Sequence, residues 1–359
     1  MNKDRNIGWD IVRGIGIILV VIGHCLPYLY FVHFIYLFHM GLFFISSGIF
    51  FKCPSFTPPL TYQKTISGIK QYVLKKLKSL YIPWVLTNIC LLLVQNYCVK
   101  FNMADVSYHG TDYLKVIGHV FLFGGIKNPM LGALWFLRTL FGASIILYIV
   151  MSFVKSQKRQ VLVIFALYLV GMLVNLLGKE LPYNMERMMV VCLVIYIGYL
   201  LNKYKITKFI SLCLRKESIF LMVVVLLIAA IFVRIDLNRN EYSYLFVFPL
   251  MALLGTFMCL KASSMISKIK GLKQTFSFLG RNSLYILILH VIAFKFVSIL
   301  IVSLYNLPYQ PPSKNLYNFV ISDNIGDFWW ILYTITGLAI PVAFVYIKKQ
   351  ILNLFFQIK

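Results

Sequence analysis

The chain of 359 residues is poor in charge, and above all in acidic residues. Charged side chains make up 13% of it, and only 11 residues are Asp or Glu. A soluble globular domain carries about 25% charged residues, which cover its surface with groups that water solvates well. The scarcity of charge therefore argues against an ordinary soluble domain and predicts a surface that faces lipid.

Paired cysteine motifs are also missing. The seven cysteines are odd in number, and none of them forms a CxxC pair. This pattern indicates neither a disulfide framework nor a zinc site. We expect small buried side chains at these positions, with no metal and no permanently bound cofactor. The cysteines lie mostly in or beside apolar runs, at Cys25, Cys53, Cys90, Cys98, Cys192, Cys213 and Cys259.

Long apolar runs are abundant. Hydrophobic residues make up 60% of the chain, its mean hydropathy is +0.82, and runs long enough to span a bilayer recur to the C-terminus. We predict an all-α, polytopic membrane helix bundle that forms a single domain over residues 1–359, with no appended soluble domain. About ten transmembrane helices are expected, at residues 7–28, 34–51, 79–97, 131–153, 160–177, 187–202, 218–235, 243–261, 280–305 and 327–347.

The basic residues predict the orientation of this bundle. If the N-terminus is cytoplasmic, 25 of the 35 Lys and Arg residues lie in inner segments and 8 in outer segments. This bias predicts that both termini are cytoplasmic. The basic residues lie in short segments between apolar runs, which argues against a nucleic-acid partner despite the net charge of +24. Residues 52–78 are predicted to be a basic cytoplasmic segment on the membrane surface, and residues 98–130 an extracytoplasmic loop.

The first predicted helix contains three ionisable side chains, Asp10, Arg13 and His24. Such groups are costly inside a membrane and are therefore candidates for function; they also argue against a cleavable signal peptide. The eleven-residue step from Arg13 to His24 returns to within about 20° of the same helix face and covers about 16 Å of depth. Together the three residues predict a polar stripe through the membrane. The alternative is that Asp10 and Arg13 simply pair at the membrane edge.

The second predicted helix repeats this arrangement in FHMGLFFISSG, residues 38–48. His39 and Ser46 are seven residues apart and share one face. His39 is expected at a depth similar to that of His24, so the two histidines could meet across the bundle. The alternative is that each histidine makes its own hydrogen bond to a neighbouring helix.

Later helices carry further polar groups. Arg138 lies within LWFLRTLFG, residues 134–142, and Ser283 and His290 are seven apart in GRNSLYILILH, residues 280–290. Each is a weak indication by itself. Glu186 and Arg187, at the expected outer end of the sixth helix, are interpreted as a pair at the membrane interface.

The basic run KKLKSLYIP, residues 75–83, allows two interpretations. Lys75 and Lys78 are three residues apart, so their ammonium groups can converge on a phosphate-bearing cytoplasmic ligand. The alternative is that the run only anchors the chain at the cytoplasmic membrane surface.

These pieces, taken in order, resemble the acyltransferase-three family of membrane acyltransferases, which includes bacterial sugar O-acetylases. The matching segments are WDIVRGIGIILVVIGH (9–24), FHMGLFFISSG, the basic run that ends at Pro83, LWFL with its Trp135 (134–137), and GRNSLYILILH. The resemblance implies a ten-helix bundle that transfers an acyl group from acyl-coenzyme A to a carbohydrate hydroxyl. It also implies that His24 is the essential histidine and Arg13 its paired basic residue. Lys75 and Lys78 stand where the family usually has arginines.

We therefore expect a membrane O-acyltransferase that moves an acetyl or other short acyl group from acetyl-CoA or a related acyl-CoA to a cell-surface glycan or its lipid-linked precursor. The expected partners are this donor, the carbohydrate and membrane lipid, in a bacterial cytoplasmic membrane, and a homo-oligomer is left open. Many relatives carry a C-terminal hydrolase-like domain, so we expect transfer here to finish within the membrane domain or on a partner. The expected catalytic residues are His24, Arg13, Asp10 and His39; the donor-binding residues are Arg13, Lys75 and Lys78; substrate or oxyanion contacts are assigned to Arg138, Trp135, Ser283 and His290.

This chemistry also follows from the residue types. Acyl transfer needs a base for the acceptor hydroxyl, and histidine is well matched near neutral pH. It also needs a positive or donating group near the developing oxyanion, for which His39 or Arg138 would serve. The main alternative is a transporter or flippase for a lipid-linked sugar, which usually shows inverted repeats; none is evident in this sequence. An assembly scaffold would not need Arg13 and His24 on one face.

Overall fold

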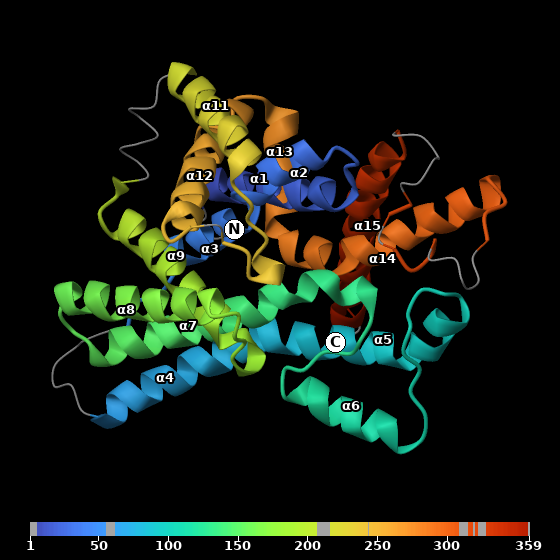
Figure 1. Ribbon diagram of the computed structural model, residues 1–359, viewed down its shortest axis with the longest axis horizontal. Coiled ribbons are helices and arrows are strands. Elements are labelled where there is room, and N and C mark those ends of the chain that lie inside the picture. The colour runs from blue at the N-terminus through green and yellow to red at the C-terminus, as the bar shows by residue number, and fades with distance from the viewer. Residues whose placement is uncertain are drawn as a thin grey trace.

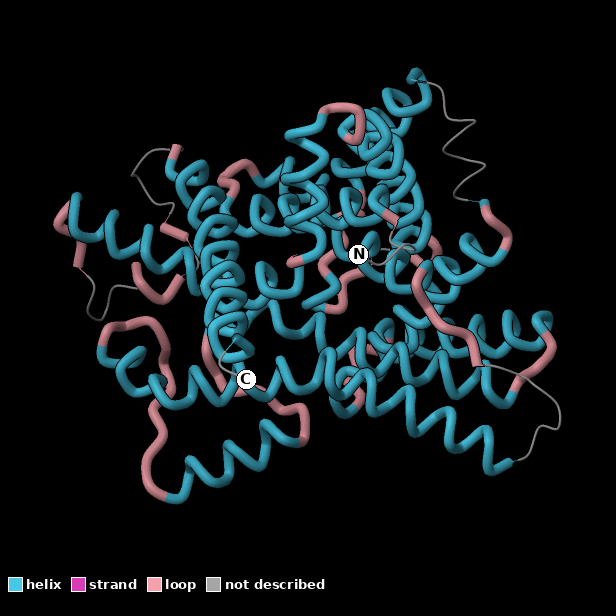
Figure 2. Tube along the Cα trace, turned by 180° about the vertical axis from the view of Figure 1, so that it is seen from behind, coloured by secondary structure: helices cyan, strands magenta, loops and turns pink. Residues whose placement is uncertain are grey.

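A computed structural model describes residues 6–54, 62–206, 216–242, 244–308, 315–318, 320–321 and 328–357. Within these ranges the chain is helical and contains no strand (Figures 1 and 2). The elements are α1 (Ile7–Cys25), α2 (Leu29–Tyr36), α3 (His39–Ile49), α4 (Tyr62–Lys76), η1 (Leu77–Tyr81), α5 (Ile82–Lys100), α6 (Thr111–Phe121), η2 (Pro129–Leu134), α7 (Trp135–Phe153), α8 (Gln157–Leu176), η3 (Pro182–Asn184), α9 (Met185–Lys203), α11 (Lys216–Phe232), η4 (Leu237–Arg239), α12 (Val247–Ile266), α13 (Lys270–Arg281), α14 (Ser283–Leu304) and α15 (Trp329–Gln357).

The predicted membrane helices are present. In the described part of the chain, nine helical segments are long and apolar enough to cross a membrane, and a tenth apolar helix, Glu217–Phe232, is shorter. Each of the ten predicted helices has a counterpart among them, so the prediction of an all-α polytopic bundle is confirmed. The cytoplasmic location of both termini stays a prediction, and Lys3, Arg5, Lys208, Arg215, Lys314 and Lys359, which entered the charge count, lie outside the described residues.

The second and third predicted helices differ from expectation in shape. The second is divided into α2 and α3 at Phe38, whose backbone leaves the helical region (φ −141°, ψ −21°). The third begins earlier, because α4, η1 and α5 join into one segment from Tyr62 to Lys100. The π-helical turn η1 lies just before Pro83, whose ring would otherwise clash with the carbonyl four residues earlier in a regular α-helix. Residues 55–61 of the predicted basic segment lie outside the described residues.

Helix α1 lies inside the bundle, surrounded by α3, α12, α13, α14 and α15. Figure 1 shows α11, α12 and α13 on one side of it and α14 and α15 on another, while α4, α7 and α8 run side by side below. Glycines allow the closest crossings: a Cβ on Gly48 of α3 would lie 2.0 Å from the carbonyl oxygen of Ile195 on α9. Small residues permit such backbone approach between membrane helices. The crossings hold α1 and α3 in fixed positions relative to their neighbours.

Candidate active site

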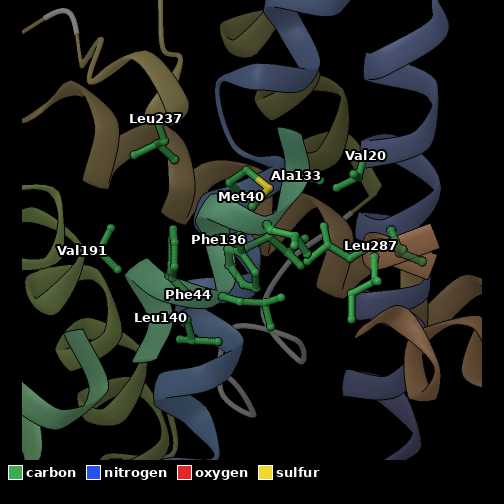
Figure 3. Packing of buried hydrophobic residues seen from close by; sticks show 14 of the residues in the cluster. Val20, Met40, Phe44, Ala133, Phe136, Leu140, Val191, Leu237 and Leu287 are labelled. Atoms are coloured by element: carbon green, nitrogen blue, oxygen red, sulfur yellow. The ribbon is translucent and has the colours of Figure 1, made fainter. Parts of the chain in front are cut away.

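One end of α1 borders a cavity of about 300 Å³ that mixes apolar and polar walls. Side chains from five parts of the chain converge here: α1, the α2–α3 segment, η2 with the start of α7, the segment 235–239, and α14. Figure 3 shows the apolar part of this wall, where Val20, Met40, Ala133 and Leu287 lie close together. The lining residues are Val20, Gly23, His24, Tyr36, His39, Met40, Gly132, Ala133, Trp135, Ile235, Asp236, Leu237, Asn238, Arg239 and Leu287.

Three histidines meet at this end of the bundle. The ring of His24 lies 5.2 Å, centroid to centroid, from the ring of His290 on α14. It lies 6.4 Å from the ring of Tyr36, which in turn lies 4.9 Å from the ring of His39. The structure thus places His24, His39 and His290 around one site, so the two histidines of the first two predicted helices come together.

Hydrogen bonds to backbone carbonyls define the tautomers of two of these rings. Nδ1 of His39 lies 2.9 Å from the carbonyl oxygen of Ile35, and Nδ1 of His290 lies 3.0 and 2.9 Å from the carbonyl oxygens of Ile286 and Leu287. A carbonyl only accepts, so each Nδ1 carries the hydrogen and each neutral ring presents the lone pair of Nε2. Nε2 of His290 is buried and has no hydrogen-bond partner among the described residues.

A charged segment, residues 235–239, forms another part of the cavity wall. Asp236 accepts a hydrogen bond from the backbone N–H of Asn238 at 2.9 Å, and the Nε of Arg239 lies 3.6 Å from its other carboxylate oxygen. The side chain of Arg239 is 74% exposed and that of Asp236 25% exposed. The charged wall therefore runs from the molecular surface into the cavity that His24 borders.

A buried network holds this segment in place. Asn240 accepts a hydrogen bond from the Nε of Arg187 at 2.8 Å and donates one to Glu186 at 3.0 Å. Glu186 is fully buried and Arg187 is 3% exposed, so the two residues that the sequence suggested as an interfacial pair lie inside the protein, bridged by Asn240. Tyr242 donates its hydroxyl to the same Asn240 oxygen at 3.1 Å, and burial raises the pKa of that phenol, so it stays protonated.

Arg187 also connects the network to the cavity wall. Its guanidinium carbon lies 5.2 Å from the centre of the Trp135 ring, within the range of a cation–π contact. Trp135 is the predicted substrate-binding residue of the LWFL segment, and the structure places it among the residues that line the cavity.

Arg13 and Asp10 lie toward the other end of α1. The Nε of Arg13 donates a hydrogen bond to the hydroxyl of Ser46 at 2.7 Å, and its guanidinium carbon lies 4.5 Å from the centre of the Phe50 ring. Asp10 is buried where α1 crosses α13. Neither residue lines the cavity at His24, from which Arg13 is separated by about 16 Å of helix.

Lys75 and Lys78 border a groove of about 530 Å³ together with Gln71, Leu74 and Ser79. Both lysines are exposed, and their convergence on a phosphate-bearing ligand stays a prediction. Lys76 instead places its ammonium 5.4 Å from the centre of the Tyr72 ring.

The remaining predicted residues are not part of the histidine site. Arg138 donates hydrogen bonds to the carbonyl of Phe123 at 3.2 Å and to the side chain of Asn184 at 2.5 Å. Ser283 is the first residue of α14, about 10 Å along the helix axis from His290. Neither residue lines the cavity that holds His24 and His39.

Sequence reasoning missed the polar residues that line the cavity together with the histidines. Asp236, Asn238 and Arg239 belong to a short connection between apolar helices, where charge is ordinary. The sequence contained one signal for this wall: Glu186 and Arg187, two charged residues in the first turn of an apolar helix. They hold the connection against the protein through Asn240. Among the described residues, no group of three or more His, Cys, Asp and Glu side chains could hold a metal ion.

In the part of the chain that the structure describes, nine apolar helical segments define an integral membrane protein, and histidines line a cavity at one end of α1. Residues 6–348 match the model of a protein family that is described as an acyltransferase domain. The chain therefore belongs to the acyltransferase-three family, as the motifs in its sequence suggested. No curated protein and no solved structure matches it.

Proposed function

We propose that the protein transfers an acetyl or other short acyl group from acyl-CoA to a hydroxyl of a carbohydrate, and that His24 is the general base. The observation that carries this proposal is the position of His24, which borders a cavity together with His39 and lies against the buried ring of His290. An acyltransferase needs a base within reach of a bound hydroxyl, and an imidazole is matched to this task near neutral pH.

The proposed reaction is a direct transfer. An imidazole nitrogen of His24 takes the proton of the acceptor hydroxyl while the hydroxyl oxygen attacks the thioester carbonyl carbon. The resulting tetrahedral intermediate loses the coenzyme A thiolate as its C–S bond breaks, and the thiolate takes the proton from His24. The products are the acyl ester of the carbohydrate and free coenzyme A, and His24 returns to its neutral state.

His39 has a different role in this proposal. Its Nδ1–H is engaged by the carbonyl of Ile35, so the neutral ring offers only the lone pair of Nε2. A lone pair can accept a hydrogen bond from a sugar hydroxyl but cannot donate one to an oxyanion. We therefore assign His39 to the orientation of the acceptor.

The phosphates of the donor are assigned to a different part of the protein. Lys75 and Lys78 border one groove and suit the phosphates of acyl-CoA. Arg13 lies on the same helix as His24, about 16 Å away in depth, and the extended pantetheine arm is the part of the donor that would cover this distance. With the predicted orientation, the donor enters from the cytoplasm of a bacterium and the acceptor belongs to the cell envelope.

A transfer assay with purified protein in detergent tests the proposal. The probe is acetyl-CoA labelled in the acetyl group, supplied with a glycan extract from the envelope of the host cell. We expect label in the carbohydrate with the wild type and with His109→Ala, an exposed histidine outside the site, but not with His24→Ala. Folded wild-type protein that neither binds acetyl-CoA nor transfers label would contradict the proposal and favour transport of a lipid-linked sugar.

A further inference from the structure

We infer that residues 235–239 form the acceptor-binding wall of this cavity, where Asp236 and Arg239 hold an uncharged, polyhydroxylated ring against His24. The inference rests on the proposed function and extends it to the recognition of the acceptor. The observation behind it is the composition of the cavity, whose lining combines two histidines with a carboxylate, an amide and a guanidinium.

The chemistry of this wall matches hydroxyl groups. A carboxylate only accepts hydrogen bonds, a guanidinium only donates them, and the amide of Asn238 does both. A sugar hydroxyl also donates and accepts, so neighbouring hydroxyls can satisfy Asp236 and Arg239 at the same time. The formal charges of these two residues cancel, which favours a neutral ring over an anionic ligand.

The contact between Asp236 and Arg239 can be opened by such a ligand. The carboxylate and guanidinium are 3.6 Å apart, and the arginine is largely exposed. Ion pairs of this kind contribute little to stability, so hydroxyl groups can replace the contact at small cost. Asp236 keeps its hydrogen bond from the N–H of Asn238 at 2.9 Å, and this bond orients the carboxylate before the acceptor arrives.

The rest of the segment is built to stay in place. The backbones of Asp236 and Glu241 exchange two hydrogen bonds of 2.9 Å, and Asn240 adopts a left-handed conformation (φ 58°) between buried Glu186 and Arg187. Burying charged groups is expensive unless they are fully hydrogen-bonded. Because Arg187 also contacts the ring of Trp135, one residue positions two walls of the cavity.

The size and the aromatic lining of the cavity agree with a sugar ring. A volume of about 300 Å³ is at the lower end for ligand pockets and suits a single ring. Tyr36 and Trp135 supply apolar surface for the C–H groups of a sugar, while the histidines and Asp236 contact its hydroxyls.

Acceptor kinetics test this inference. Transfer of label from acetyl-CoA is measured with the wild type, Asp236→Asn and Arg239→Gln while the concentration of the envelope glycan extract and that of acetyl-CoA are varied separately. In both variants we expect the fold-increase in the apparent KM for the glycan to be at least ten times the fold-increase in the KM for acetyl-CoA. Glu241→Gln is the matched control, because this exposed carboxylate lies two residues beyond the segment and does not line the cavity. It should leave both KM values unchanged.

The outcomes separate the two proposals. If the wild type transfers label and the two variants keep its glycan KM, the acceptor role of the segment is wrong while the acyltransferase function stands. Equal changes in both KM values would also contradict the acceptor role, since they indicate general damage to the site. Wild-type protein that transfers no label overturns the proposed function, and the acceptor role with it. Thermal unfolding in detergent, measured for each variant, shows that the proteins compared are folded.

Discussion

The rings of His24 and His290 lie 5.2 Å apart although the two residues are on helices at opposite ends of the sequence. Nδ1 of His290 is engaged by two backbone carbonyls, and its Nε2 is buried and has no partner among the described residues. This lone pair is available to a proton on the neighbouring imidazole of His24. We expect His290 to position His24 and to favour the tautomer that leaves the other nitrogen of His24 free to act as a base.

Replacement of His290 with alanine should therefore slow transfer without weakening the binding of acetyl-CoA. We expect kcat to fall roughly 100-fold, the order of magnitude that misplacement of a catalytic group costs, with the KM for acetyl-CoA nearly constant. His290→Gln, whose amide oxygen can accept a hydrogen bond, should recover part of the rate. Steady-state kinetics on the three proteins check this. Equal rates for the alanine and glutamine variants would contradict a positioning role.

The buried network around Asn240 should contribute strongly to stability. Arg187→Met leaves the carboxylate of Glu186 buried without its neighbouring cation, and loss of one member of a buried charged pair costs about 3–5 kcal/mol. We expect a clearly lower unfolding temperature in detergent, and partial recovery in the double variant Glu186→Gln/Arg187→Met. Arg159→Met, which changes an exposed arginine, is the control. If Arg187→Met and Arg159→Met unfold at the same temperature, the network does not contribute to stability.

The groove at Lys75 and Lys78 should determine affinity for the donor. A hydrogen bond to a charged group contributes about 1.5–3 kcal/mol, so replacing both lysines with glutamine should raise the KM for acetyl-CoA roughly tenfold or more. Their replacement with arginine should preserve or strengthen binding, because guanidinium contacts phosphate in a bidentate manner. Lys70→Gln, an exposed position on the same helix, serves as the control. If neither double substitution changes the KM for acetyl-CoA, the phosphates of the donor bind outside this groove.

The crossing of α3 and α9 should tolerate no additional atoms. A Cβ on Gly198 would lie 2.2 Å from the carbonyl oxygen of Ile45. The backbone shifts that such overpacking forces typically lower the free energy of unfolding by about 1–3 kcal/mol. Gly198→Ala should therefore lower the unfolding temperature. At Gly118 on α6 a Cβ would meet no atom within 4 Å, so Gly118→Ala should have a much smaller effect. Equal unfolding temperatures for the two variants would contradict this packing.

The helices could be predicted from the sequence because the length and polarity of an apolar run are local properties. The break at Phe38 and the extension of the third helix to Tyr62 could not, since both depend on how α3 and α4 pack in three dimensions. The family could also be predicted, because its motifs recur in order along the chain.

The candidate site was predictable only in part. Residue spacing predicted that His24 and His39 could meet across the bundle. It did not show that His290 joins them, or that Arg138 contacts Asn184 outside the cavity. The charged wall could not be predicted, because Asp236 lies in a connection between helices whose position depends on tertiary contacts, such as those of Asn240 with Glu186 and Arg187. The catalytic and donor-binding roles stay predictions.

The central claim is that His24 acts in the chemical step. Its most direct test is a single-turnover measurement in which protein saturated with labelled acetyl-CoA is mixed rapidly with acceptor glycan. General base catalysis by a positioned side chain contributes about 10²–10⁴-fold to the rate, so His24→Ala should bind acetyl-CoA like the wild type and transfer the label slower by that factor. A variant that binds the donor normally and transfers it at the wild-type rate would contradict the claim.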